Sequence, residues 1–324
     1  MKAIDPINSE KPSEVVTKKP AVDKEKKIND KSTPDKDTWE KDMAAEHVAF
    51  DLLGDEDLEI DTSAFGAILT QTPEMLYIIQ RAERLSRSDV PVLINGQAGC
   101  GKGLFAKSIH RAGKRKLKPF IAVKCAAILS SHMAADFFGC VKNAMSGVSK
   151  TQVGWVEQAN AGTLFLDEFH ALPAFIQVQL LKIIRTGEYQ RVGDARPRKT
   201  NIRIIAATAK NLTEEVRLGR LRADLFYAIS IGVLHLPPLC ERRGDLFFLA
   251  NYFLKQINQA AASRPGYVPK KLSAKARTLI VSYSWPGNIS ELYATLLRAT
   301  LWTDNEKISY DELKEAMLPG VGRS

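Results

Sequence analysis

Short apolar runs alternate with amphipathic stretches along the middle of the chain, starting near Phe65. The segment from Met75 to Leu85 places its large apolar residues at helical spacing, which predicts an amphipathic helix. Val90 to Ile94 is a brief apolar run that ends at Asn95-Gly96 and is typical of a buried strand. Further strands are predicted at 120–123, 163–166 and 202–206, and further helices at 103–111 and 176–185. Because buried strands that alternate with helices form parallel sheets covered on both faces, the pattern predicts an α/β fold.

The pattern changes after Pro237-Pro238, where helical periodicity takes over. Four helices are predicted in this part, at 246–260, 273–283, 290–303 and 310–318. We therefore expect an α/β unit over residues 63–238 and a smaller, all-helical unit over residues 239–324.

The first 62 residues have a different composition, rich in Lys, Asp, Glu, Pro and Ser. Such a segment cannot bury enough apolar surface to offset the entropy of ordering it, so a disordered tail is predicted. This segment holds 10 Lys/Arg and 17 Asp/Glu, whereas the rest of the chain holds 36 and 20. A basic body favours a nucleotide, a nucleic acid or an acidic protein as partner, although a solvated surface would carry the same charge.

Some classes of protein are disfavoured by what the sequence lacks. The four cysteines form no CxxC pair, so we expect reduced thiols rather than a zinc site or a redox couple. No apolar run approaches the roughly 20 residues that span a membrane. The N-terminus is too polar for a secretory signal, so we expect a cytoplasmic protein with no membrane contact.

The strongest chemical signal is the glycine-rich stretch Gly96-Gln-Ala-Gly-Cys-Gly101-Lys102, which lies between a predicted strand and a predicted helix. It fits the P-loop pattern, in which glycines let backbone N–H groups surround phosphates and the lysine neutralises their charge. A glycine turn with a chance lysine is the alternative. The residues predicted to bind nucleotide here are Gly96, Gly99, Cys100, Gly101, Lys102, Gly103 and Leu104. Gly103 stands where Ser or Thr usually ligates magnesium.

A second signal follows some sixty residues later, where the apolar run of Gly162-Thr-Leu-Phe-Leu ends in Asp167 and Glu168. Two carboxylates at a strand end suit the Walker B role in ATP hydrolysis. Asp167 would hold Mg²⁺, directly or through water, and Glu168 would orient the attacking water.

Together these stretches resemble the AAA+ domain of the sigma-54-dependent transcriptional activators (bacterial enhancer-binding proteins), which are ATPases that remodel sigma-54 RNA polymerase. The resemblance runs from about Phe65 to Leu318. It rests on Gln71–Met75, Val92–Gly96, Pro119–Ala127, Phe138–Gly139, Gly162–Glu168, Gln190–Gly193, Arg203–Thr208, Leu221–Tyr227, His235–Leu239 and Trp285–Asn288. It implies an AAA+ P-loop NTPase fold, an αβα sandwich with a parallel sheet and a C-terminal helical lid. It also implies ATP and Mg²⁺ as ligands and assembly into a ring, usually a hexamer.

The resemblance assigns two more site residues. Thr208 falls in the sensor I region, and Arg222 falls where an arginine finger reaches the nucleotide of the neighbouring subunit. Such a finger stabilises the charge on the transferring phosphoryl group. Taken alone, Arg222 would be read as a surface cation, and its place in the run Leu221-Arg-Ala-Asp-Leu225 favours the finger.

Several positions depart from the family pattern. The loop that contacts sigma-54 in the family is Asn143 to Val148 here, with Met145 in place of an aromatic residue. Lys124 replaces an asparagine, which suggests an ion pair with Glu168 that would hold this carboxylate away from water. The remaining changes are Ala209 after sensor I, Ala228 for a second finger arginine and Ser290 for the lid arginine.

Three functions stay open on this evidence. The first is an active ATPase that remodels sigma-54 RNA polymerase or a related partner through the Asn143 to Val148 loop. The second is a hydrolysis-impaired, nucleotide-binding regulatory subunit that acts in a mixed ring or on a partner other than sigma-54. The third is sequence-tolerant nucleic-acid binding by basic clusters at 111–118 and 196–199, since no helix-turn-helix is expected after the lid.

Overall fold

The computed structural model describes residues 62–127, 132–144 and 150–318. The predicted tail lies outside these residues, apart from Thr62, and so do Met145 to Val148 of the predicted sigma-54 loop. Across the described ranges, no helix combines the length and the apolar character that crossing a bilayer requires.

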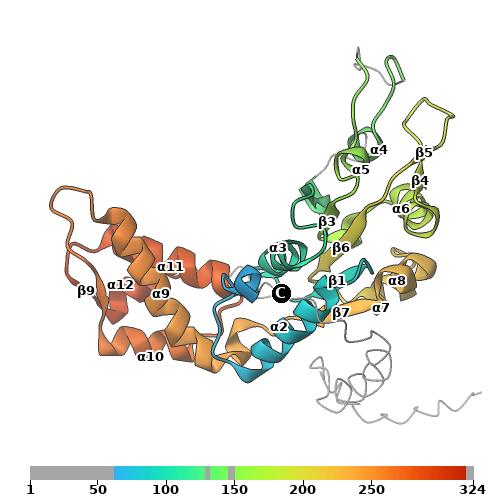
Figure 1. Ribbon diagram of the computed structural model, residues 1–324. Coiled ribbons are helices and arrows are strands. Elements are labelled where there is room, and N and C mark those ends of the chain that lie inside the picture. The colour runs from blue at the N-terminus through green and yellow to red at the C-terminus, as the bar shows by residue number, and fades with distance from the viewer. Residues whose placement is uncertain (1–61, 128–131, 145–149, 319–324) are drawn as a thin grey trace, which may run out of the picture. The chain divides into compact units, whose positions relative to one another are not determined.

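Within these residues a five-stranded sheet forms the centre of the first unit, in the order β2-β3-β6-β1-β7 (Figure 1). All of its strand pairs are parallel. The strands are β1 (Val92–Asn95), β2 (Phe120–Lys124), β3 (Thr163–Asp167), β6 (Arg203–Thr208) and β7 (Gly232–His235). The parallel sheet confirms the α/β prediction, and β7 is the strand that the sequence pattern missed.

Successive apolar side chains of each strand point to opposite faces of this sheet. Helices therefore cover both faces. Leu164 and Leu166 of β3 enter a core formed with the apolar sides of several helices. Phe165, between them, points to the other face, where α3 packs against β1, β3 and β6. The helices of this unit are α2 (Pro73–Ser86), α3 (Lys102–Ala112), α4 (Met133–Phe138), α5 (Trp155–Gln158), α6 (Ala174–Thr186), α7 (Leu212–Arg217) and α8 (Ala223–Ile229).

Short irregular elements complete this unit. An antiparallel pair joins β4 (Glu188–Tyr189) to β5 (Arg198–Lys199). Single turns of 3-10 helix are η1 (Thr62–Phe65), η2 (Cys125–Ala127) and η3 (Phe169–Ala171). The turn η3 matters for function because it begins directly after the strand end that carries Asp167 and Glu168.

Two arginines stabilise the side of the sheet where the strands begin. The buried Arg203 donates to the carbonyls of Ser86 and Leu85 at 3.2 and 2.6 Å, and burial lowers its pKa to about 10. Arg115 bonds Asp89 through two nitrogens, at 2.9 and 3.1 Å, and the carbonyl of Gly162 at 3.0 Å. Arg115 belongs to the predicted basic cluster at 111–118, and these contacts give it a structural role.

The second unit has its own apolar core, built from residues between Leu239 and Ala316 (Figure 1). It contains η4 (Leu239–Glu241), α9 (Arg243–Ala261), α10 (Ala274–Ser282), α11 (Asn288–Trp302) and α12 (Tyr310–Ala316). The prediction of an all-helical unit was wrong in one respect. A short parallel pair of β8 (Lys271–Leu272) and β9 (Lys307–Ile308) joins the segments before α10 and α12, and two-residue strands carry too little pattern to be recognised.

A buried ion pair fixes the start of α9. Asp245 accepts hydrogen bonds from Thr70 Oγ1 at 2.7 Å and Gln71 N at 2.6 Å, and Arg242 Nη2 lies 2.7 Å away. Burial by itself would raise the pKa of Asp245. The hydrogen bonds and the arginine outweigh burial, so the pKa lies below its usual value. The contact ties the segment before α2 to the beginning of the helical unit.

Candidate nucleotide-binding and catalytic site

The loop between β1 and α3 turns through two glycines with left-handed backbone conformations. Gly99 and Gly101 have φ values of 77° and 107°, which side-chain-bearing residues rarely adopt. Gly101 is the N-cap of α3, so the helix N-terminus opens onto the loop. Gly96 N bonds the carbonyl of Thr208 at 3.1 Å, which attaches the start of the loop to β6.

The lysine of this loop is folded back onto it. Lys102 is 6% exposed, and its Nζ bonds the carbonyls of Gly96 at 2.9 Å and Gln97 at 3.3 Å. The same Nζ lies 3.3 Å from Oε1 of Glu168. The structure therefore brings the P-loop lysine together with Glu168, the carboxylate that directly follows β3.

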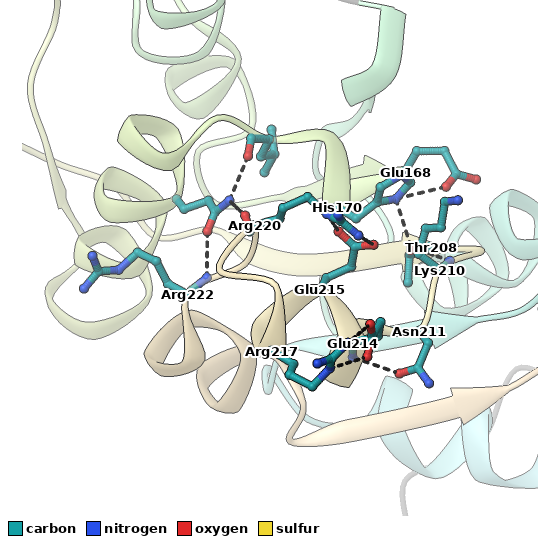
Figure 2. Close-up of polar contacts among 12 residues, drawn as sticks. Glu168, His170, Thr208, Lys210, Asn211, Glu214, Glu215, Arg217, Arg220 and Arg222 are labelled. Atoms are coloured by element: carbon teal, nitrogen blue, oxygen red, sulfur yellow. Dashed lines mark hydrogen bonds and ion pairs between the residues drawn. The ribbon is translucent and has the colours of Figure 1, made fainter. Parts of the chain in front are cut away.

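Glu168 is the centre of a small polar cluster at the strand ends (Figure 2). Its backbone is left-handed, with φ 52°, which is uncommon for a residue with a side chain. Its Oε2 accepts from Ala209 N at 3.3 Å and lies 3.4 Å from His170 Nδ1. His170 Nδ1 is also 3.0 Å from Oγ1 of Thr208, which accepts from Lys210 N. Thr208 and Glu168 therefore both contact the ring of His170.

Asp167 lies beside an open pocket of about 320 Å³ rather than inside this cluster. The same pocket is lined by Gly103 and Lys107 of α3 and by Lys124 at the end of β2. Lys124 is the strand neighbour of Asp167 in the sheet register. In the described residues Glu168 pairs with Lys102, and Lys124 forms no ion pair with it, so the expected Lys124–Glu168 contact is absent.

The donor set next to this pocket fits one kind of magnesium site. No group of three or more His, Cys, Asp or Glu side chains is arranged around a metal position in the described residues. Mg²⁺, however, is usually held by one or two carboxylates together with substrate phosphates and water. Asp167 and Glu168 supply such carboxylates, while Gly103 contributes no hydroxyl.

Two other predicted binding residues have simpler surroundings. Cys100 is buried beneath the loop, and burial raises the pKa of its thiol. A Cβ added to Gly96 would lie 2.8 Å from Cys100 Sγ, so this glycine lets the loop close over the sulfur. Leu104 is 39% exposed on the first turn of α3.

Arg222 does not join the cluster around Glu168. It is the N-cap of α8, and its guanidinium points away from Glu168 (Figure 2). Its Nε and Nη2 bond the two carboxylate oxygens of Asp224 at 3.0 and 2.8 Å. Both side chains are substantially exposed, at 48% and 34%. Among the described residues, its guanidinium therefore bonds Asp224 and takes no part in the polar cluster around Glu168.

Comparison with known families decides the classification. A model of the sigma-54 interaction domain matches residues 68–235, and a model of the AAA+ ATPase lid domain matches residues 240–323. The chain belongs to the sigma-54 interaction domain family. The nucleotide-binding AAA+ fold described above is the fold of this family.

Known relatives of this sigma-54 interaction domain are transcription regulators. The nitric oxide reductase transcription regulator NorR2 of Cupriavidus necator is 42% identical over 236 residues, 73% of this chain and 44% of that protein. The alginate biosynthesis regulatory protein AlgB of Pseudomonas putida is 38% identical over 244 residues, 75% of this chain and 54% of that protein. The chain thus spans about half the length of the curated relatives it matches.

Solved structures show the same arrangement of elements. NtrX from Brucella abortus has a TM-score of 0.69 and 31% identity, over 80% of this chain and 57% of that one. Its complex with ATP has a TM-score of 0.68 and 28% identity, over 86% of this chain and 62% of that one.

The lid contacts the loop between β1 and α3 directly. Asn288, fully buried, donates from Nδ2 to the carbonyl of Ala98 at 2.9 Å and to Gln97 Oε1 at 3.1 Å. Its Oδ1 accepts from Leu239 N at 2.7 Å. A Cβ added to Gly99 would overlap the carbonyl oxygen of Gly287, so the two loops pack without a gap.

Three residues that contact this site were not among the predicted site residues. Ala209 contributes a backbone N–H, which no side-chain pattern can reveal. His170 stands two residues after Glu168, and that closeness was the available signal. Asn288 was part of a matched motif, but its contact with the P-loop depends on how the lid folds back.

Proposed function

We propose that this chain binds ATP with Mg²⁺ and hydrolyses it to regulate transcription by sigma-54 RNA polymerase. The observation that carries the proposal is the meeting of Lys102, Glu168 and Thr208 at the carboxyl ends of neighbouring parallel strands. This is the edge at which open α/β sheets bind ligands. NtrX, whose structures include complexes with ADP and with ATP, supports nucleotide as the ligand.

Each residue of the cluster has a chemical task in this proposal. Lys102 exchanges its loop carbonyls and Glu168 for the phosphates and neutralises their charge. Glu168, once released, accepts a hydrogen bond from the attacking water and orients it. The Thr208 hydroxyl would sense the terminal phosphate, and His170, whose Nδ1 lies near both Thr208 and Glu168, would couple the two. Mg²⁺ held through Asp167 would supply charge neutralisation between the phosphates.

Turnover in this proposal requires a second copy of the chain. Arg222 points away from its own Glu168 and has an exposed guanidinium, so it would complete the site of a neighbouring subunit in a ring. It would have to exchange Asp224 for the neighbour's nucleotide. An arginine finger of this kind typically contributes about 10³–10⁵ to the rate of phosphoryl transfer. A hexamer is the ring that the family resemblance implies.

The proposed contact with sigma-54 runs through the loop that contains Asn143 to Val148. The base of this loop is held by Val141 N, which donates to Val192 O at 3.1 Å, and by a turn at Asn143 with φ 63°. Asn143 and Ala144, the described part of this loop, follow the short helix α4 in the same α/β unit as β3. Movement of that unit on hydrolysis would move the loop.

Promoter opening by purified components tests this function. We expect the chain to drive open-complex formation by sigma-54 RNA polymerase with ATP but not with ADP. Replacement of Met145 by aspartate should abolish opening while leaving ATP turnover within about twofold. ATP turnover without any effect on sigma-54 RNA polymerase would point to another protein substrate. Tight ATP binding without turnover would instead favour the regulatory-subunit alternative.

A further inference from the structure

Gln177 is a polar residue in a place where apolar side chains are expected. It lies on α6, between Ile176 and Val178, and its side chain is 1% exposed. Burial of a carboxamide is unfavourable unless its polar atoms find hydrogen-bond partners. The helix would therefore be more stable with an apolar residue here if the amide had no task.

The carboxamide of Gln177 uses both of its ends. Its Nε2 donates to the carbonyls of Leu172 and Arg220, at 2.8 Å in each case. Its Oε1 accepts from the backbone N–H of Arg222 at 3.0 Å. Three partners from two separate segments leave the amide a single orientation.

The first of these segments is the turn after the Walker B strand. Leu172 follows η3, whose first residue comes directly after Glu168. The turn is closed by Ala171 N, which donates to the carbonyl of Glu168 at 2.9 Å. Gln177 is thus bonded to the end of the turn that begins at Glu168.

The second segment carries Arg222. The chain between α7 and α8 has the partly buried Glu215 as one anchor, which bonds Arg220 through both oxygens, at 2.6 and 2.8 Å. Gln177 is the other anchor, because it holds a carbonyl and an N–H on either side of Leu221. The Arg222 backbone is therefore fixed, while its guanidinium is free to exchange Asp224 for another anion.

We propose that Gln177 is a positioning residue, which ties Arg222 to the Walker B turn and so sets the place of the arginine offered to the neighbouring subunit. The inference rests on the proposed function, in which Arg222 acts in trans. It gives this amide a role in the neighbour's site and none in nucleotide binding by its own subunit.

Gln177→Met is the main test variant, because methionine keeps the length and volume of the side chain but cannot hydrogen-bond the three partners. Gln177→Glu keeps an acceptor for Arg222 N but cannot donate to the two carbonyls. For Gln177→Met we expect ATP affinity within twofold of wild type and a turnover number at least tenfold lower. Gln177→Glu should lie at or below that level.

Mixed assemblies distinguish positioning from a general structural defect. Glu168→Gln subunits have no working water-orienting group but an intact Arg222, whereas Gln177→Met subunits have the reverse. An equimolar mixture should hydrolyse ATP several-fold faster than either variant alone. A mixture of Gln177→Met with Arg222→Ala, in which neither partner supplies a well-placed arginine, should show no gain.

The proposal is overturned if Gln177→Met turns over ATP within twofold of wild type, or if its loss is not relieved by Glu168→Gln subunits. Amide hydrogen exchange of the peptide spanning Arg220 to Asp224 gives a test that needs no turnover. Exchange should accelerate in Gln177→Met, and unchanged exchange would also overturn the proposal. If the wild type hydrolyses no ATP, the proposed function has failed. Accelerated exchange in Gln177→Met would even then show that Gln177 holds the backbone of Arg222 in place.

Discussion

The Nζ of Lys102 lies 3.3 Å from Oε1 of Glu168. The lysine proposed to bind phosphate and the carboxylate proposed to orient water therefore neutralise each other's charge. Lys102 is almost fully buried and Glu168 is 28% exposed. The attraction between two charges in such surroundings is stronger than in a surface ion pair, because water screens it poorly. Binding of a triphosphate would give Lys102 a better partner and release Glu168.

Gly103 offers a direct test of how this site holds magnesium. A Cβ added here would meet only Phe165 Cε1, at 3.9 Å, so a small side chain fits without rearrangement. Gly103→Ser should tighten ATP binding about two- to tenfold in the presence of Mg²⁺, because its hydroxyl can ligate the metal. Gly103→Ala is the matched control, since it adds the same Cβ without an oxygen. Equal gains in the two variants, or a gain that persists in EDTA, would contradict the prediction.

Lys124 is expected to act on the nucleotide rather than on Glu168. It lines the pocket beside Asp167 and Gly103 and has no ion pair with Glu168 in the described residues. Lys124→Asn should weaken ATP binding about threefold or more at low salt and less at high salt, because an exposed cation is screened. Isothermal titration at two ionic strengths measures this. A rise in turnover at unchanged affinity would show instead that Lys124 restrains Glu168.

Asn288 connects the lid to the P-loop, and its loss should affect both stability and nucleotide binding. Its φ of 54° suits asparagine or glycine, so Asn288→Gly removes the amide without adding backbone strain. The variant leaves Leu239 N and the Ala98 carbonyl without this partner, at a cost of about 1–3 kcal/mol each. We expect a lower melting temperature and ATP affinity reduced about tenfold. An unchanged affinity would mean that the lid contact does not shape the loop.

Protonation of Glu312 should destabilise the lid at acid pH. Its carboxylate accepts hydrogen bonds from Thr303 Oγ1 and from Ser309 N at the start of α12, and the bond from Thr303 contributes most to a pKa of about 2. Because the folded-state pKa lies below the unfolded value near 4.5, this stabilisation is complete above pH 4.5. It is lost as the pH falls from about 4.5 to about 2.

Urea unfolding of Glu312→Gln beside wild type measures this contribution. The stability difference between the two should be largest at neutral pH and shrink steadily below pH 4.5. A difference that stays constant down to pH 2 would contradict the assignment.

The features that could be predicted from the sequence are those that lie in one continuous stretch of the chain. The strands β1, β2, β3 and β6 are contiguous apolar runs, and the loop from Gly96 to Lys102 is a contiguous motif, so both could be recognised without a structure. The strand β7 was missed because Gly232 to His235 has few residues and runs directly into Pro237-Pro238.

The contacts within the site could not be predicted in the same way. Lys124 and Asp167 are neighbours in the sheet register, yet the lysine that reaches Glu168 is Lys102. That choice depends on which way each side chain leaves its strand or helix. Gln177 is one of several polar residues in α6, and only the folded structure brings Arg222 to it.

ATP hydrolysis as a function of protein concentration tests the central claim most directly, with Glu168→Gln and Arg222→Ala as variants. We predict that turnover per subunit rises with concentration and falls at least a hundredfold in each variant, while both variants retain ATP binding. An equimolar mixture of the two should recover measurable turnover, because one supplies the arginine and the other the site. Turnover that is independent of concentration, or that survives in Arg222→Ala, would contradict an active site shared between subunits.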